Sequence, residues 1–242
     1  MGATQDSFDL QPGRVLARKF EVIRRLGAGW EGEVYLVRER ATGIDRAAKL
    51  FFPERNPRNR TLNEYARRLH RLRECPILVS YVTQETIRAH GADVSVLISE
   101  FVDGEMLCEF LARQPGQRLD VFQGLHLLHA LAEGVSAIHA NNDYHGDLHA
   151  ANVIVRRLGL GFEVRLLDLH RWPGTRSSNI QEDVCNLVRL LYDVLGGQRT
   201  YAKHPPEIKG VLRGLRRSLI LESFRTAGDI ALHLETMPWE SR

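Results

Sequence analysis

Apolar and polar residues alternate with a period of two over much of the first hundred positions. This alternation is typical of strands that bury one face. It predicts an antiparallel sheet with strands inside residues 15–29, 33–43, 44–52, 77–88 and 92–102. One helix is expected among them, since apolar side chains recur at helical spacing between two proline-containing segments, at Leu62, Tyr65, Leu69 and Leu72.

Helical periodicity takes over after Asp103-Gly104. Helices are expected over 105–112, 119–140, 179–195, 205–219 and 226–237, with one short β pair over 152–157 and 162–169. Thr226 and Asp229 form a capping-box pattern at the start of the last helix. We therefore expect an α+β fold of two lobes with a ligand-binding cleft between them. The expected boundaries are a loose tail (1–14), an N-lobe (15–102), and a hinge with a C-lobe (103–239).

Composition changes this picture little. Hydrophobic residues make up 43% and charged residues 26% of the 242 positions, as in ordinary globular proteins. No apolar run reaches the roughly 18 residues of a membrane span. The N-terminus lacks a signal-peptide pattern, so we expect a cytoplasmic protein without a membrane partner. The net charge of +3 does not favour a nucleic-acid partner. The cysteines are too widely spaced for a disulfide framework or a zinc knuckle.

Lysine is rare in this chain, which makes Lys49 noticeable. The 33 basic residues include only four lysines, Lys19, Lys49, Lys203 and Lys209. Lys49 lies in the apolar stretch RAAKLFF, where a compact ammonium group suits the binding of phosphate oxygens. A lysine that extends its ammonium group to solvent from an edge strand is the alternative.

Gly27, Gly29 and Gly32 lie between two predicted strands. Glycines let backbone amides approach a polyphosphate closely. The strand–loop–strand context argues against a dinucleotide-binding Rossmann site and against a P-loop. A bulged hairpin remains the alternative, but Val34 after the last glycine and Lys49 on the next strand strengthen the phosphate-loop interpretation.

The stretch YHGDLHAANVIV (144–155) concentrates polar side chains directly before an apolar strand. His145 and His149 have the spacing of a zinc-binding pair on a helix. However, Gly146 follows the first histidine where a metalloprotease has its glutamate, and the stretch joins a helix to a strand. A stretch that caps a turn or holds a substrate is the alternative.

Taken together and in this order, the motifs resemble the protein kinase-like family over residues 15–237. The resemblance implies a bilobal fold, with an N-lobe sheet plus one helix and a mainly helical C-lobe that lacks a full activation segment. It also implies ATP and Mg²⁺ as cofactors. The implied catalytic residues are Asp147, Lys49 and Asn152. The implied ATP-binding residues are Gly27, Gly29, Gly32, Val34, Ala47, Lys49, Glu64, Glu100, Val102, Glu105 and Ile154.

The resemblance also implies a role for each side chain near the reaction. Asp147 would orient the attacking hydroxyl and accept its proton. Asn152 and Asp168 would hold Mg²⁺ through hard oxygen ligands. Lys49 would tether phosphate oxygens, with Glu64 as its partner; Glu74 and a solvated Glu64 are the alternatives. Two further residues would be structural: Asp183, buried beneath the loop, and His145, which would pack toward Leu169.

Several positions depart from the family pattern. Gly146 stands where an arginine would contact a phosphorylated activation loop, so regulation by such phosphorylation is not expected. The segment from Asp168 to Asp183 is short and lacks an Ala-Pro-Glu motif, which argues against an ordinary peptide-docking platform. His149 replaces the lysine usual in protein kinases and resembles the small-molecule and atypical branches.

The N-terminal half looks closest to bacterial eukaryotic-like serine/threonine protein kinases. The sequence therefore favours an ATP- and Mg²⁺-dependent enzyme that phosphorylates a protein hydroxyl. A small-molecule kinase (aminoglycoside-, sugar- or lipid-phosphotransferase-like) is one alternative, and a nucleotide-binding pseudokinase scaffold is another. Retention of Lys49, Asp147, Asn152 and Asp168 favours catalysis over a scaffold role, because loss of such a group costs several powers of ten in rate.

Overall fold

The computed structural model describes residues 7–159 and 161–238. These residues divide into two compact units, each described separately below. The first contains the described residues up to Glu74 together with Val79–Val102, and the second contains Cys75–Leu78 together with the described residues from Asp103 onward. Within the described residues, no helix combines the length and apolar character needed to cross a membrane.

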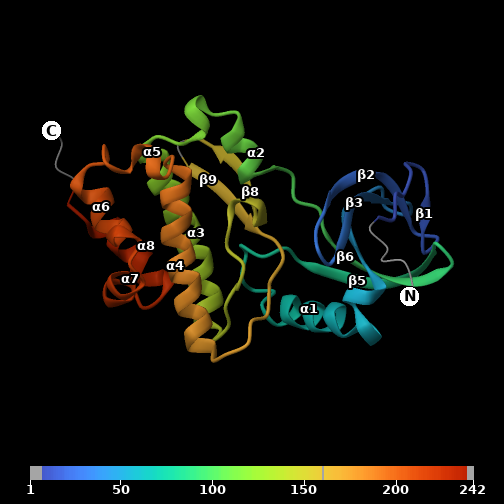
Figure 1. The fold of residues 1–242 in the computed structure, drawn as a ribbon. Coiled ribbons are helices and arrows are strands. Elements are labelled where there is room, and N and C mark those ends of the chain that lie inside the picture. The colour runs from blue at the N-terminus through green and yellow to red at the C-terminus, as the bar shows by residue number, and fades with distance from the viewer. Residues whose placement is uncertain (1–6, 160, 239–242) are drawn as a thin grey trace. The chain divides into compact units, whose positions relative to one another are not determined.

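The first unit is a twisted antiparallel sheet with one α-helix (Figure 1). The strand order is β1-β2-β3-β4-β6-β5. The strands are β1 (Val15–Leu16), β2 (Phe20–Ala28), β3 (Gly32–Glu39), β4 (Asp45–Phe51), β5 (Tyr81–Ala89) and β6 (Ala92–Glu100). Between β4 and β5 the chain forms two short 3-10 turns, Pro53–Arg55 and Pro57–Asn59, and then helix α1 (Arg60–Arg71).

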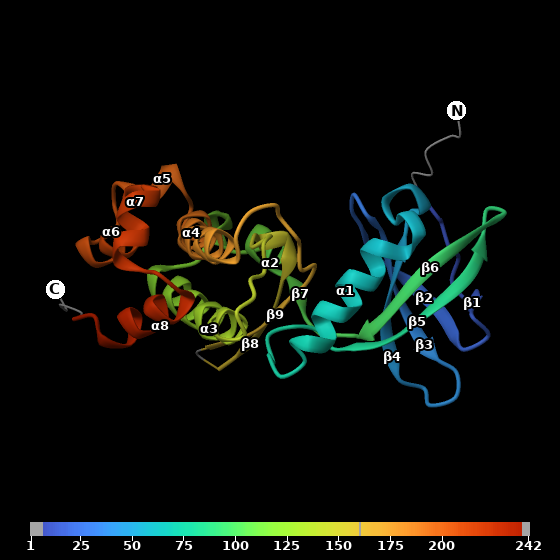
Figure 2. The same cartoon turned by 90° about the horizontal axis from the view of Figure 1, so that it is seen from below.

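The two faces of this sheet are covered differently. One face carries the main core of the unit, which includes Tyr35, Val37, Ala48, Leu50 and Ile98. Helix α1 lies across the opposite face (Figure 2), where Leu62 and Ala66 pack with Phe51 and Leu97. Alternate residues of β4 therefore belong to different cores, as the period-two pattern requires.

The N-terminal segment corrects the sequence-based boundary. Residues 7–14 were expected to belong to a loose tail, but Phe8 and Leu10 are only 1% and 5% exposed. The ring of Phe8 stacks on Phe52 with centroids 5.2 Å apart, and the Leu10 N–H donates to the Tyr35 hydroxyl at 3.1 Å. The segment packs because it covers apolar sheet surface that water would otherwise contact. Residues 1–6 of the predicted tail lie outside the described residues.

A buried carboxylate also attaches the N-terminal segment to the sheet. Glu33 is 0% exposed and accepts hydrogen bonds from Ser7 Oγ (2.9 Å), Phe8 N (3.1 Å) and the Tyr35 hydroxyl (2.5 Å), with Arg25 as its ion-pair partner at 2.8 Å. Burial raises the pKa of Glu33, but these hydrogen bonds and the Arg25 charge outweigh it, so the pKa lies below the usual value. Burial and the neighbouring carboxylate raise the pKa of Tyr35 to about 12.

The packing of the N-terminal segment gives a stability prediction. Phe8→Ala should lower the free energy of unfolding by about 3 kcal/mol, because it leaves a cavity over the sheet. Gln11→Ala, at an exposed position of the same segment, should change it by less than about 0.5 kcal/mol. Chemical denaturation of both variants measures the difference, and equal stabilities would contradict the packing of this segment.

The lowered pKa of Glu33 gives a pH prediction. A carboxyl with a depressed folded-state pKa contributes stability that is complete above its unfolded value of 4.5 and is lost as the pH falls through the folded value. Glu33→Gln should therefore differ most from the wild type at neutral pH and progressively less below pH 4.5. The check is the free energy of unfolding of both proteins from pH 3 to 7, with the exposed Glu109→Gln expected to keep the wild-type profile.

The second unit is mainly helical, with a small sheet of order β7-β8-β9. Its strands are β7 (Glu105–Met106), β8 (Val153–Leu158) and β9 (Gly161–Leu166). Its helices are α2 (Leu107–Ala112), α3 (Val121–Ala140), α4 (Arg176–Val194), α5 (Gln198–Tyr201), α6 (Pro206–Leu212), α7 (Arg217–Ser223) and α8 (Ala227–Thr236). The long helix α3 is central, because α4, α8 and β9 all pack against it (Figure 1).

Local backbone chemistry explains where the helices differ from expectation. The helix expected over 205–219 is interrupted, because Arg213 (φ 48°) and Gly214 (φ 60°) adopt left-handed conformations between α6 and α7. Helix α4 begins earlier than expected, at Arg176, since the Thr175 hydroxyl caps it by accepting from Ser178 N. The predicted capping box of α8 is present, with Thr226 N donating to the Asp229 carboxylate at 2.9 Å.

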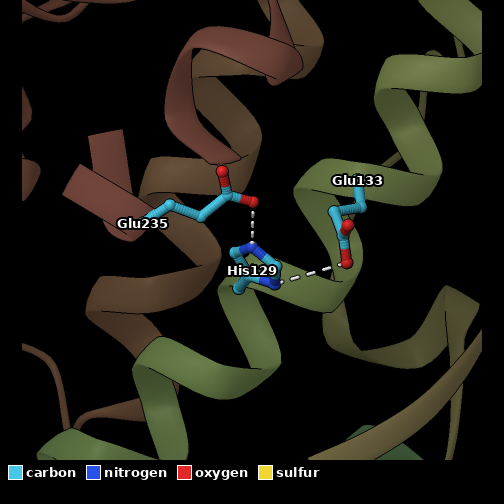
Figure 3. Close-up of side chains that lie close together, drawn as sticks. All are labelled: His129, Glu133 and Glu235. Atoms are coloured by element: carbon cyan, nitrogen blue, oxygen red, sulfur yellow. Dashed lines mark hydrogen bonds and ion pairs between the residues drawn. The ribbon is translucent and has the colours of Figure 1, made fainter. Parts of the chain in front are cut away.

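A histidine joins α3 to α8 (Figure 3). His129 Nδ1 lies 3.3 Å from a Glu133 oxygen one turn along α3, and Nε2 lies 2.9 Å from a Glu235 oxygen on α8. Each ring nitrogen therefore faces a different carboxylate. A protonated ring can donate to both, whereas a metal ion would bind only one ring nitrogen. The geometry is that of a hydrogen-bonded contact between two helices.

Candidate active site

The polar stretch 144–152 is held from below by a buried carboxylate on α4. Asp183 is 0% exposed and accepts the backbone N–H groups of His145 (2.6 Å) and Gly146 (2.8 Å). His139 of α3 contacts the same carboxylate at 3.2 Å through Nε2. The His139 Nδ1 accepts from Ala227 N, so Nε2 carries the proton in a neutral ring. The position expected for Asp183, beneath this loop, agrees with the structure.

His145 is a structural residue whose two ring nitrogens are both occupied. Its Nε2 lies 2.8 Å from the Leu167 carbonyl, and its Nδ1 accepts from Asp147 N at 3.2 Å. A carbonyl can only accept, so the proton resides on Nε2 and the Nδ1 lone pair is already used. No lone pair is left for a metal, which contradicts the zinc-pair alternative with His149. The expected packing of the ring toward Leu169 stays a prediction.

Asp147 and Asn152 are in direct contact. The Asn152 amide nitrogen donates to the Asp147 carbonyl at 2.9 Å and to its carboxylate Oδ2 at 3.0 Å. Asn152 is 8% exposed, whereas the Asp147 side chain is 42% exposed. His149 Nε2 lies 3.5 Å from the same carboxylate. The loop therefore fixes a half-exposed carboxylate whose orientation is set by a buried amide.

Asp168 is tied to the same loop through its neighbours. Leu167 N donates to the Asn152 carbonyl, and His170 N donates to the His145 carbonyl, both at 2.9 Å. Asp168 itself has φ 55°, in the left-handed region that few residues other than glycine adopt. The second unit thus brings Asp147, Asn152 and Asp168 to one loop cluster, and an amide oxygen and a carboxylate are ligands that suit a hard cation such as Mg²⁺.

On the first unit, the predicted ligand residues share one face of the sheet. Val34 lies opposite Lys49, and Ala47 lies opposite Ser99, so these side chains point to the same side. This is the face against which α1 packs at Phe51 and Leu97. Val34, Ala47 and Lys49 are only partly buried, which leaves them available to a ligand.

Lys49 has a partner that the sequence did not indicate. Its Nζ lies 2.8 Å from a Glu31 oxygen in the glycine-rich turn and 5.3 Å from the centroids of Phe51 and Tyr65. The side chain is 11% exposed, so it is not the solvent-directed lysine considered as an alternative. Glu31 lies between Gly29 and Gly32, and nothing in the sequence around it indicated that it would pair with Lys49. The expected pairing of Lys49 with Glu64, on α1, stays a prediction.

The three loop glycines serve different purposes. A Cβ on Gly32 would lie 1.8 Å from the Leu50 carbonyl oxygen, so this glycine is needed for strand packing. A Cβ on Gly27 or Gly29 would meet no atom within 4 Å. Gly29 N donates to the Gly32 carbonyl and closes a tight turn. At its tip, Trp30 is 67% exposed, with the Arg55 guanidinium 4.0 Å from the ring centroid.

The remaining predicted ligand residues lie on β6, after it, and on β7 and β8. Glu100 ends β6, where its N–H donates to the Ser80 carbonyl, and Val102 is the last residue of the first unit. In the second unit, Glu105 on β7 pairs with Arg113 and lies opposite Val155. Ile154 is a partly buried residue of β8.

Comparison with known proteins gives consistent matches. The family model of the protein kinase domain matches residues 20–171. The chain is 34% identical over 156 residues to serine/threonine-protein kinase pkn2 of Myxococcus xanthus, covering 64% of this chain but only 18% of pkn2. It is 29% identical over 172 residues to cyclin-dependent kinase B2-2 of Arabidopsis thaliana, covering 69% of this chain and 54% of that protein. The chain thus spans about a fifth and about half of these two relatives.

A solved structure shares the fold. The kinase domain of Mycobacterium tuberculosis PknI superposes with a TM-score of 0.68 at 18% identity, covering 93% of this chain and 98% of that domain. This likeness confirms the predicted α+β kinase fold, with an antiparallel sheet and helix in the N-terminal part and a helical C-terminal part.

The buried carboxylate beneath the loop gives a further prediction. Asp183→Ala should lower the free energy of unfolding by about 3 kcal/mol, because it leaves the buried N–H groups of His145 and Gly146 without an acceptor. Glu109→Gln on the surface of α2 should stay within about 0.5 kcal/mol of the wild type. Chemical denaturation compares the two, and a stable Asp183→Ala variant would contradict the support described here.

Proposed function

The chain belongs to the protein kinase domain family, and from that premise we propose that it is an ATP- and Mg²⁺-dependent serine/threonine protein kinase. The observation that carries the proposal is the contact of Asn152 with the Asp147 carboxylate. The same loop also accepts hydrogen bonds from Leu167 and His170, which lie on either side of Asp168. A carboxylate held in this way can act on a substrate hydroxyl, beside oxygen ligands for a divalent cation.

Each residue has a defined part in the proposed transfer. Asp147 orients the acceptor hydroxyl and takes its proton as the oxygen forms a bond to the γ-phosphorus of ATP and the bond to the β-phosphate oxygen breaks. Asn152 and Asp168 would hold Mg²⁺, which would neutralise charge on the phosphate oxygens. Lys49 binds phosphate oxygens as a point charge, with Glu31 or Glu64 as its carboxylate partner.

The nucleotide site follows from the same assignment. The loop that contains Gly27, Gly29 and Gly32 lets its backbone approach the phosphates closely. The residues assigned to adenine and ribose are Val34, Ala47, Glu100 and Val102 on the first unit, and Glu105 and Ile154 on the second. The proposal is supported by the shared face of Val34, Ala47 and Lys49, and by the open space around Gly27 and Gly29.

A small-molecule kinase is the second candidate, and one observation favours it. Only residues 169–175 separate Asp168 from the start of α4, so the chain between them is short for a platform that binds a peptide. A pseudokinase scaffold is the third candidate, disfavoured by the presence of all four residues to which the chemistry is assigned.

Asp147→Asn tests the proposal. Purified protein is incubated with labelled ATP, Mg²⁺ and a generic protein substrate, and labelled protein is quantified. The variant should lose about 10²–10⁴-fold of the incorporation, since general-base catalysis contributes that much. Asp93→Asn, at an exposed position of β6, is the matched control and should retain activity.

The other outcomes separate the candidates. ATP binding without labelled protein would contradict the protein-kinase assignment and direct the search to small-molecule acceptors. Absence of ATP binding would contradict catalysis and the nucleotide-binding scaffold alike, and would leave a pseudokinase that only binds a partner. Equal labelling by Asp147→Asn and the wild type would contradict the role given to Asp147.

A further inference from the structure

Trp172 helps to attach the short segment after Asp168 to the polar loop 144–152. The indole Nε1 of Trp172 donates to the Gly146 carbonyl at 2.5 Å. The backbone of Trp172 also meets the Tyr144 hydroxyl, which accepts from Trp172 N at 3.3 Å and lies 3.4 Å from its carbonyl oxygen. Asn179 of α4 donates to the same carbonyl at 3.4 Å. Tyr144 and Asn179 are 6% and 8% exposed, so Trp172 is fixed to buried partners.

The other half of this contact is the glycine that departs from the family pattern. Gly146 has φ 88°, a conformation that side chains rarely adopt. A Cβ at this position would lie 2.5 Å from the His170 carbonyl oxygen and 3.1 Å from a Tyr144 ring carbon. The close approach of segment 169–175 therefore requires glycine at 146. The rings of His170 and Trp172, 4.5 Å apart, continue the contact along the segment.

These contacts lie next to both acidic groups of the proposed chemistry. Gly146 immediately precedes Asp147, and His170, whose N–H donates to the His145 carbonyl, follows Asp168 by two residues. A segment fastened at 170 and 172 limits the positions that Asp168 can take relative to the loop. The indole N–H supplies a hydrogen bond that a phenylalanine ring could not, and the residue remains 49% exposed.

We propose that Trp172 is a positioning residue: it latches segment 169–175 onto Gly146 and holds Asp168 in its working arrangement without any phosphate on the segment. The inference rests on the proposed function for its catalytic consequence, although the latch itself is a property of the second unit. The hydrogen bond from the Trp172 indole would order segment 169–175 in a chain that has glycine instead of arginine at position 146.

The test uses hydrogen exchange on the full chain after phosphatase treatment, with absence of phosphate verified by mass spectrometry. The variants are Trp172→Phe, which keeps a ring but removes the N–H donor, and Gly146→Ala, which adds the obstructing Cβ. Trp30→Phe is the matched control on the first unit. Loss of one hydrogen bond should speed exchange of the peptide covering 169–176 by about fivefold or more in both variants. Peptides from α3 should be unchanged, which verifies folding, and Trp30→Phe should leave 169–176 unchanged.

Two further readouts distinguish positioning from general structural support. In the ¹⁵N–¹H spectrum, the indole resonance lost in Trp172→Phe should exchange with water more slowly than that of the exposed Trp30. In the transfer assay, Trp172→Phe should lower kcat by about tenfold with the KM for ATP unchanged, because one hydrogen bond lost in the working arrangement corresponds to roughly that factor.

Defined outcomes would overturn the latch. One is unchanged exchange of 169–176 in Trp172→Phe. Another is a wild-type segment that exchanges rapidly without phosphate and becomes protected only after phosphate is incorporated. The exchange measurement needs no turnover, so the two proposals can fail separately. Faster exchange in the variants of a protein that transfers no phosphate would reject the proposed function alone, and an active protein with variant-insensitive exchange would reject the latch alone.

Discussion

The candidate site depends on one buried carboxylate. Asp183 is fully buried, so its carboxyl oxygens must accept hydrogen bonds from donors within the protein. Two of these donors are consecutive backbone N–H groups, of His145 and Gly146, and the third is the ring of His139. A carboxylate that aligns two adjacent amides fixes the direction in which the chain leaves them. Asp147 directly follows Gly146, so the hydrogen bonds to the buried Asp183 also position Asp147 at the surface.

Layers of hydrogen bonds extend outward from this carboxylate. The His145 ring hydrogen-bonds to the Leu167 carbonyl. Asn152 donates to the Asp147 carboxylate and accepts from Leu167 N, and His170 N donates to the His145 carbonyl. Trp172 adds the outermost contact, on Gly146. Each of these hydrogen bonds is ordinary by itself. Together they hold the half-exposed Asp147 carboxylate beside the buried Asn152 amide. In the first unit, strand register alone places Val34, Ala47 and Lys49 on one face of the sheet.

Much of the fold could be predicted from periodicity. Most of the strands, the long helix α3 and the capping box of α8 were indicated by spacing and by turn residues, because these depend on neighbours in the chain. Strand β7 was missed, since Glu105 and Met106 lie in a range that was expected to be helical. The N-terminal segment could not be predicted in this way. Phe8 and Leu10 are too few to form a periodic pattern, and their burial depends on a sheet face assembled from distant strands. The break between α6 and α7 was missed, since only left-handed backbone at Arg213 and Gly214 marks it.

The sequence by itself determined the family, the order of the motifs and the identity of the residues assigned to chemistry, because these are encoded in residue type and spacing. The tertiary structure decided the partners. Lys49 pairs with Glu31, and both ring nitrogens of His145 form hydrogen bonds. The absence of a side chain at Gly146 leaves room for the His170 carbonyl, and the Gly146 carbonyl accepts from Trp172. Such pairings join residues far apart in the chain, and a linear pattern cannot specify which distant group will satisfy a buried donor or occupy the space beside a glycine.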